Sequence, residues 1–282
     1  MEYLQALVLG LTQGITEFIP ISSDGHLYLV RIIFDWPDQG LLFDAVLHIG
    51  TLFAIIIVLW RELLDLVTGF WHILARRTFV QTSQARLASA TILATIPAAL
   101  TGYFFEDIFS EFYRNALSVG LWFTATGVFY FLVEQLIKSK RQKNEQQQKT
   151  EPSMWNAVLI GLAQVTALLP GVSRSGTTIA TGTLLGLTRE AAARFSFVMA
   201  TPIIAGASIL SLAQLFLQEV QVTQGQSNWG PLALGTVAAL LVGVAALKGL
   251  LELVKRWGLR VFGFYLVGLG VVVVALNYSG VF

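Results

Sequence analysis

Two short stretches place chemically reactive side chains inside otherwise apolar sequence. The first, residues 13–26, reads QGITEFIPISSDGH and holds a carboxylate at Glu17, two serines, an aspartate, a histidine and a proline. The second, residues 164–178, reads QVTALLPGVSRSGTT and adds a guanidinium at Arg174. Polar and ionisable groups are costly within an apolar segment and usually mark a functional site. We therefore expect the two stretches to meet and form one site that handles phosphate.

The second stretch has the pattern of an anion site. Pro170 ends one half-helix, and free N–H groups at the start of the next half-helix attract anions. Arg174 adds a planar, permanently charged fork that suits phosphate oxygens. The residues expected to turn the backbone or to bind substrate are Gly171, Ser173, Ser175, Gly176 and Thr178. The alternative is a structural break in which Arg174 pairs with a buried carboxylate such as Glu17, and the empty site accommodates both interpretations.

A carboxylate and an amide share one helical face in the first stretch, because Gln13 and Glu17 lie four residues apart. Glu17 could bind a divalent cation that bridges to phosphate oxygens, or it could act as a general base. The alternative is a buried carboxylate that is neutralised by Arg174. Asp44 and His48, also four apart, could line the same cavity or make a structural polar contact.

A compact turn follows Glu17 and carries most of the remaining reactive groups. Ser22 and Ser23 could donate to phosphate or attack it, or they could cap the helix that begins near Asp24. Gly25 is expected beside the bound substrate. His26 could transfer a proton to the leaving oxygen or itself attack phosphorus, although a lone histidine is often only a satisfied core residue.

Composition places both stretches in a membrane protein. Of the 282 residues, 55% are hydrophobic and only 12% are charged, whereas a soluble domain carries about 25% charged residues. The sequence contains no cysteine, which excludes disulfides and thiolate metal sites. We predict an all-α integral membrane protein without a nucleic acid partner, and leave open whether it forms a homodimer.

Prolines break two of the apolar segments into halves too short to span a bilayer. We predict re-entrant helix–loop–helix hairpins at residues 3–34 and 154–187, joined by a polar cytoplasmic linker at 138–153. The two repeats would then cover residues 1–137 and 154–282. About six transmembrane helices complete the fold, expected near residues 43–60, 87–105, 116–137, 194–217, 232–254 and 261–280. An amphipathic connector is expected at residues 61–86.

The two halves resemble each other with opposite orientations. A shift of 151 residues aligns Gly10 with Gly161, Gln13 with Gln164, Ser22 with Ser173 and Gly25 with Gly176. Each half holds one hairpin and three spans, so an odd number of crossings inverts the second half. Fifteen of the 18 Lys and Arg residues fall on one face, the exceptions being Arg31, Arg114 and Arg174. The positive-inside rule makes that face cytoplasmic and both termini external. Inverted repeats with broken helices can build a polar site inside lipid.

The paired motifs resemble those of the bacitracin-resistance family of undecaprenyl pyrophosphate phosphatases. That family combines an (E/Q)xxxE segment and a Pro-x-Ser-Ser-x-Gly-His turn with a PGxSRSxxT segment in the second half. Here they appear as QGITEFIPISSDGH and PGVSRSGTT, and the likeness covers essentially the whole chain. Gln13 takes the amide option at the first position, which weakens any scheme that needs two carboxylates on a metal. Asp24 stands where a small hydroxyl residue is common.

The resemblance implies a function and a cellular setting. It implies a phosphatase in the bacterial plasma (inner) membrane that converts undecaprenyl pyrophosphate to undecaprenyl phosphate for cell-wall synthesis. It further implies a divalent cation, Mg²⁺ or Ca²⁺, a polyprenyl pyrophosphate substrate among membrane lipids, and bacitracin resistance. The catalytic roles fall to Glu17, Ser23, His26 and Arg174, with Glu17 also as metal ligand, and we favour Ser23 as the nucleophile and His26 in proton transfer. Supporting roles in substrate binding fall to Gln13, Ser22, Ser173, Ser175 and Thr178. The alternative function is a transporter or flippase for a lipid phosphate or another anion, since inverted repeats with broken helices are a transporter architecture.

Overall fold

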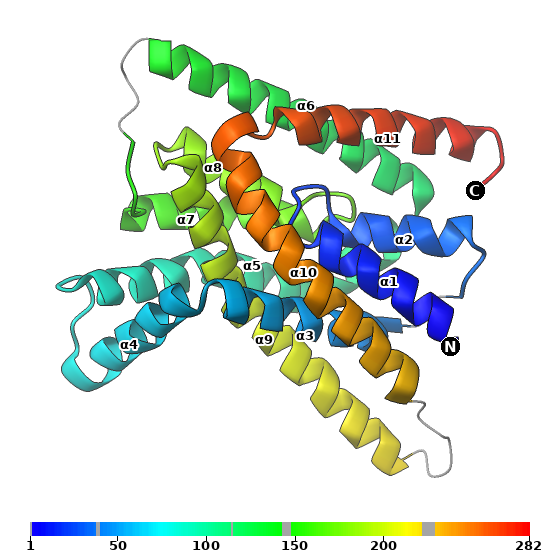
Figure 1. Cartoon of the computed structure of the whole chain (residues 1–282), viewed down its shortest axis with the longest axis horizontal. Helices are drawn as coiled ribbons and strands as arrows, with labels where there is room; N and C mark the ends of the chain where they lie inside the picture. The colour runs from blue at the N-terminus through cyan, green and yellow to red at the C-terminus, as the bar shows by residue number, and fades with distance from the viewer. Residues whose placement is uncertain (1, 38–39, 114, 143–147, 222–228) are drawn as a thin grey trace.

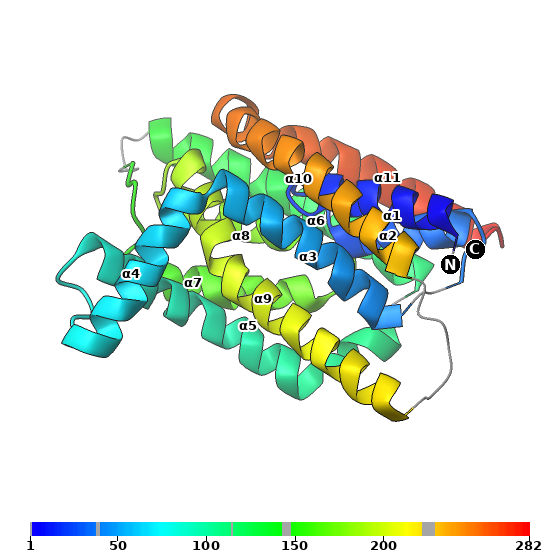
Figure 2. The same cartoon turned by 60° about the horizontal axis from the view of Figure 1, so that its bottom comes forward.

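The computed structural model describes residues 2–37, 40–113, 115–142, 148–221 and 229–282. These residues form eleven α-helices and one 3-10 turn, which confirms the all-α prediction. The two termini lie at the same end of the helical bundle (Figures 1 and 2). The elements are α1 (Tyr3–Thr16), α2 (Ser23–Ile33), α3 (Gly40–Val58), α4 (Trp60–Arg76), α5 (Ser83–Tyr113), α6 (Ala116–Gln142), α7 (Met154–Val165), η1 (Thr166–Leu168), α8 (Arg174–Leu184), α9 (Arg189–Gln221), α10 (Trp229–Trp257) and α11 (Arg260–Tyr278).

Within the described residues, five helices are long and apolar enough to cross a membrane. They are α5, α6, α9, α10 and α11, and the pair α3–α4 makes a sixth candidate that is bent by 91°. The prediction of about six spans in a multi-pass membrane protein is therefore confirmed.

The bend between α3 and α4 follows from the composition of α4. Its apolar residues Leu64, Val67, Trp71 and Leu74 recur at helical spacing and are exposed, while Glu62 and Asp65 share the same helix. A helix with charges on one face and large apolar side chains on the other is suited to a membrane–water interface. The connector expected at residues 61–86 is thus mostly this helix.

Two helix–loop–helix units supply the broken segments. In the first unit α1 ends at Thr16, a turn carries Pro20, and α2 begins at Ser23. In the second unit α7 and η1 precede Pro170, and α8 begins at Arg174. At 1.5 Å per residue each helix of the two units is about 21 Å long or less, short of the roughly 30 Å hydrocarbon core. Entry and exit on one membrane face stay a prediction for both units.

Each helix–loop–helix unit packs against a long helix from the other half of the chain. Gly10 of α1 lies so close to Gly235 of α10 that a Cβ there would overlap the Gly235 backbone. Gly161 of α7 lies equally close to Ala94 of α5. Small residues allow such close backbone approach in membrane helices. Gly10 and Gly161 are equivalent positions of the sequence repeat, and Figures 1 and 2 show both helix pairs side by side.

The two ends of the predicted linker at residues 138–153 take part in a helix and in backbone hydrogen bonds. Helix α6 continues to Gln142, because its lysines, arginine and glutamine are good helix formers. After it, the Lys149 N–H donates to the Gly186 carbonyl at 2.9 Å, and the Lys149 carbonyl accepts from the Thr188 N–H at 2.9 Å. Residues 143–147 of the predicted linker, and Arg114 of the predicted charge pattern, lie outside the described residues.

Candidate active site

The loops of the two helix–loop–helix units meet in the interior of the bundle. The buried Tyr130 of α6 donates its hydroxyl to the carbonyl of Pro20 at 2.9 Å. Gly176 in α8 leaves room for the same hydroxyl and for the Pro20 ring. A Cβ on Gly25 would lie 3.3 Å from the Cα of Gly171, which itself has a φ of +95°. The predicted glycines therefore allow the two loops to approach each other.

Glu17 and Arg174, 157 positions apart in the sequence, form an ion pair where the loops meet. The Nη2 of Arg174 donates to the Glu17 Oε1, and the Glu17 side chain is 5% exposed. The Nη1 of Arg174 is buried and has no hydrogen-bond partner among the described residues. Removing one member of a buried pair typically costs about 3–5 kcal/mol. Arg174 thus neutralises the Glu17 charge in the interior of the bundle and still presents an Nη1 donor without a partner among the described residues.

The second oxygen of Glu17 collects donors from its own unit. The Oγ of Ser23, at the first residue of α2, donates to Glu17 Oε2 at 2.8 Å. The Nε2 of Gln13, one helical turn before Glu17, donates to the same oxygen at 3.1 Å. The Oε1 of Gln13 is buried without a partner among the described residues. The carboxylate is therefore placed to accept the proton of the Ser23 hydroxyl.

The residue before Ser23 has an unusual backbone conformation. Ser22 has φ 72° and ψ 104°, and its side chain makes no capping hydrogen bond to α2. Non-glycine residues in such regions cost about 1–3 kcal/mol and cluster at functional sites. The turn that presents Ser23 is thus strained in the folded protein.

A cavity of about 120 Å³ opens between the two units. Its lining combines charged and hydroxyl groups with three apolar side chains, Ala167, Val172 and Ile204. The polar lining residues are Thr16, Glu17, Ser22, Ser23, Asp24, His48, Ser173, Arg174 and Ser175.

Hydroxyl groups organise the start of α8 around Arg174. The Oγ of Ser173 accepts the Gly176 N–H at 3.1 Å and lies 3.2 Å from the Oγ of Ser175. Thr178 lies deeper, where its Oγ1 donates to the Arg174 carbonyl and lies 2.6 Å from the Oγ of Ser196 in α9. The structure therefore places Ser173 and Ser175 at the cavity and gives Thr178 a supporting contact.

His48 lines the cavity, which was one of the two alternatives that the sequence left open. Its Nε2 is 3.6 Å from Glu17 Oε2, and its Nδ1 is 2.7 Å from the Asp44 carbonyl. Asp44, the other weak candidate, instead pairs with the buried Arg31. The signal in the sequence was a histidine within an apolar span, one helical turn after a carboxylate.

Of the four predicted catalytic residues, His26 is the one that does not line the cavity. The predicted substrate-binding residues that do not line it either are Gln13, Gly25, Gly171, Gly176 and Thr178. Its Nδ1 lies 2.8 Å from the Ser22 carbonyl, and its Nε2 lies 2.8 Å from the hydroxyl of Tyr265 in α11. The ring stacks on Tyr265, with centroids 5.7 Å apart, and also contacts Phe123. Neither Tyr265 nor Tyr130 was singled out in the sequence, because an isolated tyrosine in an apolar span carries no spacing signal.

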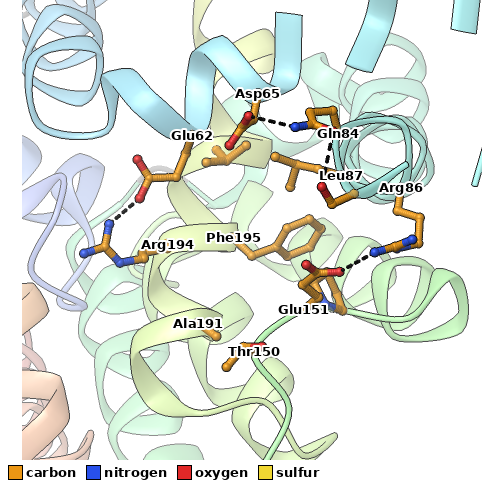
Figure 3. A pocket seen from close by; sticks show the side chains of 13 residues that line it. Glu62, Asp65, Gln84, Arg86, Leu87, Thr150, Glu151, Ala191, Arg194 and Phe195 are labelled. Atoms are coloured by element: carbon orange, nitrogen blue, oxygen red, sulfur yellow. Dashed lines mark hydrogen bonds and ion pairs between the residues drawn. The ribbon is translucent and has the colours of Figure 1, made fainter. Parts of the chain in front are cut away.

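A second cavity, of about 230 Å³, lies between α4, α5, α9 and residues 150–152 (Figure 3). Its charged groups are largely paired with one another, as Arg194 with Glu62 and Arg86 with Glu151. It contains none of the predicted site residues. Although this cavity is the larger, the residues suited to phosphate chemistry line the smaller one.

The oxygen donors around the cavity suggest how a divalent cation could bind there. Among the described residues, no three His, Cys, Asp or Glu side chains converge as metal ligands. Mg²⁺, however, usually binds one or two carboxylates together with substrate phosphates and water. Glu17 and Asp24 line one cavity, and the Gln13 Oε1 is an unsatisfied buried oxygen nearby. These oxygens fit a cation that binds together with a phosphate ligand, and they do not form a cage without one.

Comparison with known proteins gives full-length matches. A family model described as Bacitracin resistance protein BacA matches residues 6–272. The undecaprenyl-diphosphatases of Rubrobacter xylanophilus and Moorella thermoacetica are 41% and 38% identical, each over 98% of both chains. Undecaprenyl-diphosphatase 4 of Bacillus thuringiensis is 36% identical over the full length of both chains.

Proposed function

This chain belongs to the bacitracin resistance protein BacA family, and we propose that the cavity between its two loops is where it hydrolyses undecaprenyl pyrophosphate to undecaprenyl phosphate and inorganic phosphate. The observation that supports this location best is the contact of Glu17 with both Arg174 and Ser23. It joins a phosphate-binding cation, a proton acceptor and a nucleophile in one buried site. The reaction recycles the lipid carrier used in cell-wall synthesis.

Substrate binding begins with the exchange of partners at Arg174. Its unpaired Nη1 donates a hydrogen bond to a phosphate oxygen. The Nη2 can then donate to a second phosphate oxygen in place of Glu17. The hydroxyls of Ser173 and Ser175 and the N-terminus of α8 add further donors. Both nitrogens of His48 lie beside acceptors, the Glu17 carboxylate and the Asp44 carbonyl. As an imidazolium, His48 can therefore pair with Glu17 after Arg174 turns to the phosphate.

In the chemical step the Ser23 Oγ attacks the terminal phosphorus, and its proton passes to Glu17. The bond from that phosphorus to the bridging oxygen breaks, so that undecaprenyl phosphate leaves with the electron pair and takes the proton from Glu17. Water then attacks the phosphoserine. Glu17 takes a proton from the water and returns it to the departing Ser23 oxygen, which releases inorganic phosphate. Arg174 and the α8 N-terminus stabilise the charge on the transferring group in both steps.

A divalent cation, Mg²⁺ or Ca²⁺, is proposed to bind with the substrate rather than before it. Glu17, Asp24 and the Oε1 of Gln13 would hold it against the pyrophosphate. When bound, the cation neutralises phosphate charge and makes the leaving group better. Because Arg174 and Glu17 already pair, the Glu17 charge has a partner without the metal.

The surrounding membrane determines how the substrate reaches the site. The isoprenoid tail is proposed to lie among the spans beside the apolar wall formed by Ala167, Val172 and Ile204. The protein is proposed to reside in the bacterial plasma membrane, with both termini outside and the two units entering from opposite faces. On the proposed cytoplasmic side, Arg189 and Arg194 of α9 pair with Glu134 and Glu62 of the first half. Assembly as a homodimer stays a prediction.

Phosphate release by the purified protein tests this function. With undecaprenyl pyrophosphate in detergent, we expect release that stops on addition of a chelator and returns with excess Mg²⁺ or Ca²⁺. The lipid product should be undecaprenyl phosphate in equal molar amount. Release that persists in chelator would contradict the role of the cation. A folded protein that binds the lipid, moves it across vesicle membranes and releases no phosphate would favour a transporter instead.

A further inference from the structure

His26 lies next to the catalytic turn, yet its ring faces away from the cavity between the loops. It is absent from the residues that line the cavity, whereas Ser22, Ser23 and Asp24 all line it. Both ring nitrogens already have partners, the Ser22 carbonyl at Nδ1 and the Tyr265 hydroxyl at Nε2. A proton transfer from His26 to a phosphate in the cavity would require the ring to leave both partners.

The chemistry of the partners determines which nitrogen carries the proton. A backbone carbonyl can only accept, so Nδ1 must be the N–H that donates to Ser22. In the neutral ring Nε2 is then unprotonated, and it accepts from the Tyr265 hydroxyl. The second nitrogen of a histidine commonly fixes the tautomer in this way. The ring is thus held as the neutral Nδ1–H form between an acceptor and a donor.

The contact with the Ser22 carbonyl connects this pair to catalysis. Ser22 has the strained φ of 72°, and its side chain makes no capping bond that could hold the turn. Its carbonyl receives two donors from one residue, the His26 backbone N–H at 3.3 Å and the His26 Nδ1 at 2.8 Å. Ser23 follows immediately and donates to Glu17. The orientation of the Ser23 hydroxyl therefore depends on a carbonyl that His26 holds.

We propose that Tyr265 and His26 form a positioning pair for the nucleophile. Tyr265, from the last helix of the chain, holds the His26 ring, and the ring holds the Ser22 turn that presents Ser23 to Glu17. His26 then acts through the backbone and transfers no proton to substrate. The proposal rests on the proposed phosphatase function and extends it to α11, which carries neither motif. The two rings stack 11° from parallel, and this contact holds them in a fixed relative orientation.

Two substitutions at His26 separate positioning from proton transfer. The amide nitrogen of asparagine is the same number of bonds from Cα as Nδ1, so His26→Asn can still donate to the Ser22 carbonyl. His26→Gln places its amide one bond further out, at the position of Nε2. We expect His26→Asn to keep kcat within about fivefold of wild type, the worth of one ordinary hydrogen bond. We expect His26→Gln to lose about 10²-fold in kcat with KM little changed, as for a misplaced reactive group.

A double-mutant cycle tests the contribution of Tyr265. Tyr265→Phe removes only the hydroxyl and should lower kcat about five- to tenfold in the wild-type background. In the His26→Asn background it should have no further effect, because an asparagine amide has no tautomer for the hydroxyl to select. Tyr278→Phe, an exposed tyrosine at the end of the same helix, serves as the control and should leave kcat unchanged.

Two outcomes would contradict the proposed positioning role of Tyr265 and His26. If His26→Asn is as inactive as His26→Gln while both are folded, the imidazole itself is required for chemistry. If Tyr265→Phe lowers kcat equally in both backgrounds, the hydroxyl acts independently of His26. Failure of the proposed function would look different, since wild-type protein would then release no phosphate. Should His26→Gln not fold, the comparison of His26→Asn with Tyr265→Phe still decides the matter.

Discussion

Replacement of Arg174 with alanine is expected to lower kcat/KM for undecaprenyl pyrophosphate by about 10³-fold or more, the usual worth of an arginine that stabilises a transferring phosphoryl group. Arg174 is the only cation of the first turn of α8, and its Nη1 is buried without a partner among the described residues. The loss should fall mainly on kcat, because Arg174 stabilises the negative charge on the phosphoryl oxygens more strongly in the transition state than in the bound substrate. Phosphate release at saturating and limiting substrate measures both constants.

The controls for Arg174 address folding and charge separately. Removal of Arg174 leaves Glu17 buried without its ion pair, so the thermal transition in detergent must be recorded beside the activity. Arg174→Lys keeps the charge but loses the fork, and should still lose at least about tenfold. Arg86→Ala removes an arginine that pairs at the surface with Glu151 and should change neither constant. A folded Arg174→Ala protein with near-normal kcat would contradict the assignment.

Replacement of Ser23 with alanine is expected to lower kcat by roughly 10³-fold or more, because the Ser23 hydroxyl is assigned as the group that attacks phosphorus. The hydroxyl is 2.8 Å from the carboxylate that accepts its proton. The measurement is a rapid acid quench with substrate labelled at the terminal phosphate. Wild type should retain label on the protein during turnover, and Ser23→Ala should retain none.

Ser22→Ala is the matched control for the nucleophile. Ser22 is the same residue type, lines the same cavity and makes no capping bond with its side chain. Its loss should reduce kcat only a few-fold and leave the labelled intermediate intact. If Ser23→Ala protein still turns over at a substantial rate without label, water is the nucleophile and Ser23 only orients Glu17.

The sequence was sufficient to predict an all-α membrane protein with about six spans and the meeting of the two loops. Ionisable groups in apolar segments are costly, so Glu17 and Arg174 were expected to need partners, and their mutual pairing was the alternative to phosphate binding. Prolines and glycines marked where the helices break. The positive charges, gathered on one face, indicated an inverted arrangement of two halves.

The parts that the sequence did not reveal depend on tertiary contacts. His48 has no motif around it, and only the packing of α3 beside the first loop brings it within 3.6 Å of Glu17. The contact of His26 with Tyr265 joins residues 239 positions apart, and no local pattern encodes it. Helix α6 extends into the expected linker because the polar residues after its apolar segment still favour helix.

The most direct test of the central claim compares two buried glutamates that each pair with an arginine. Glu17 pairs with Arg174 at the cavity, whereas Glu134 pairs with Arg189 on the proposed cytoplasmic side and does not line the cavity. Glu17→Gln and Glu134→Gln therefore disturb similar interactions, but only the first removes a proton acceptor beside Ser23. We expect folded Glu17→Gln to release phosphate about 10²- to 10⁴-fold more slowly than wild type, the usual worth of a general base. Glu134→Gln should release it at a near-normal rate. Equal rates for the two variants, or normal release by Glu17→Gln, would contradict the assignment of the phosphatase site to the cavity between the loops.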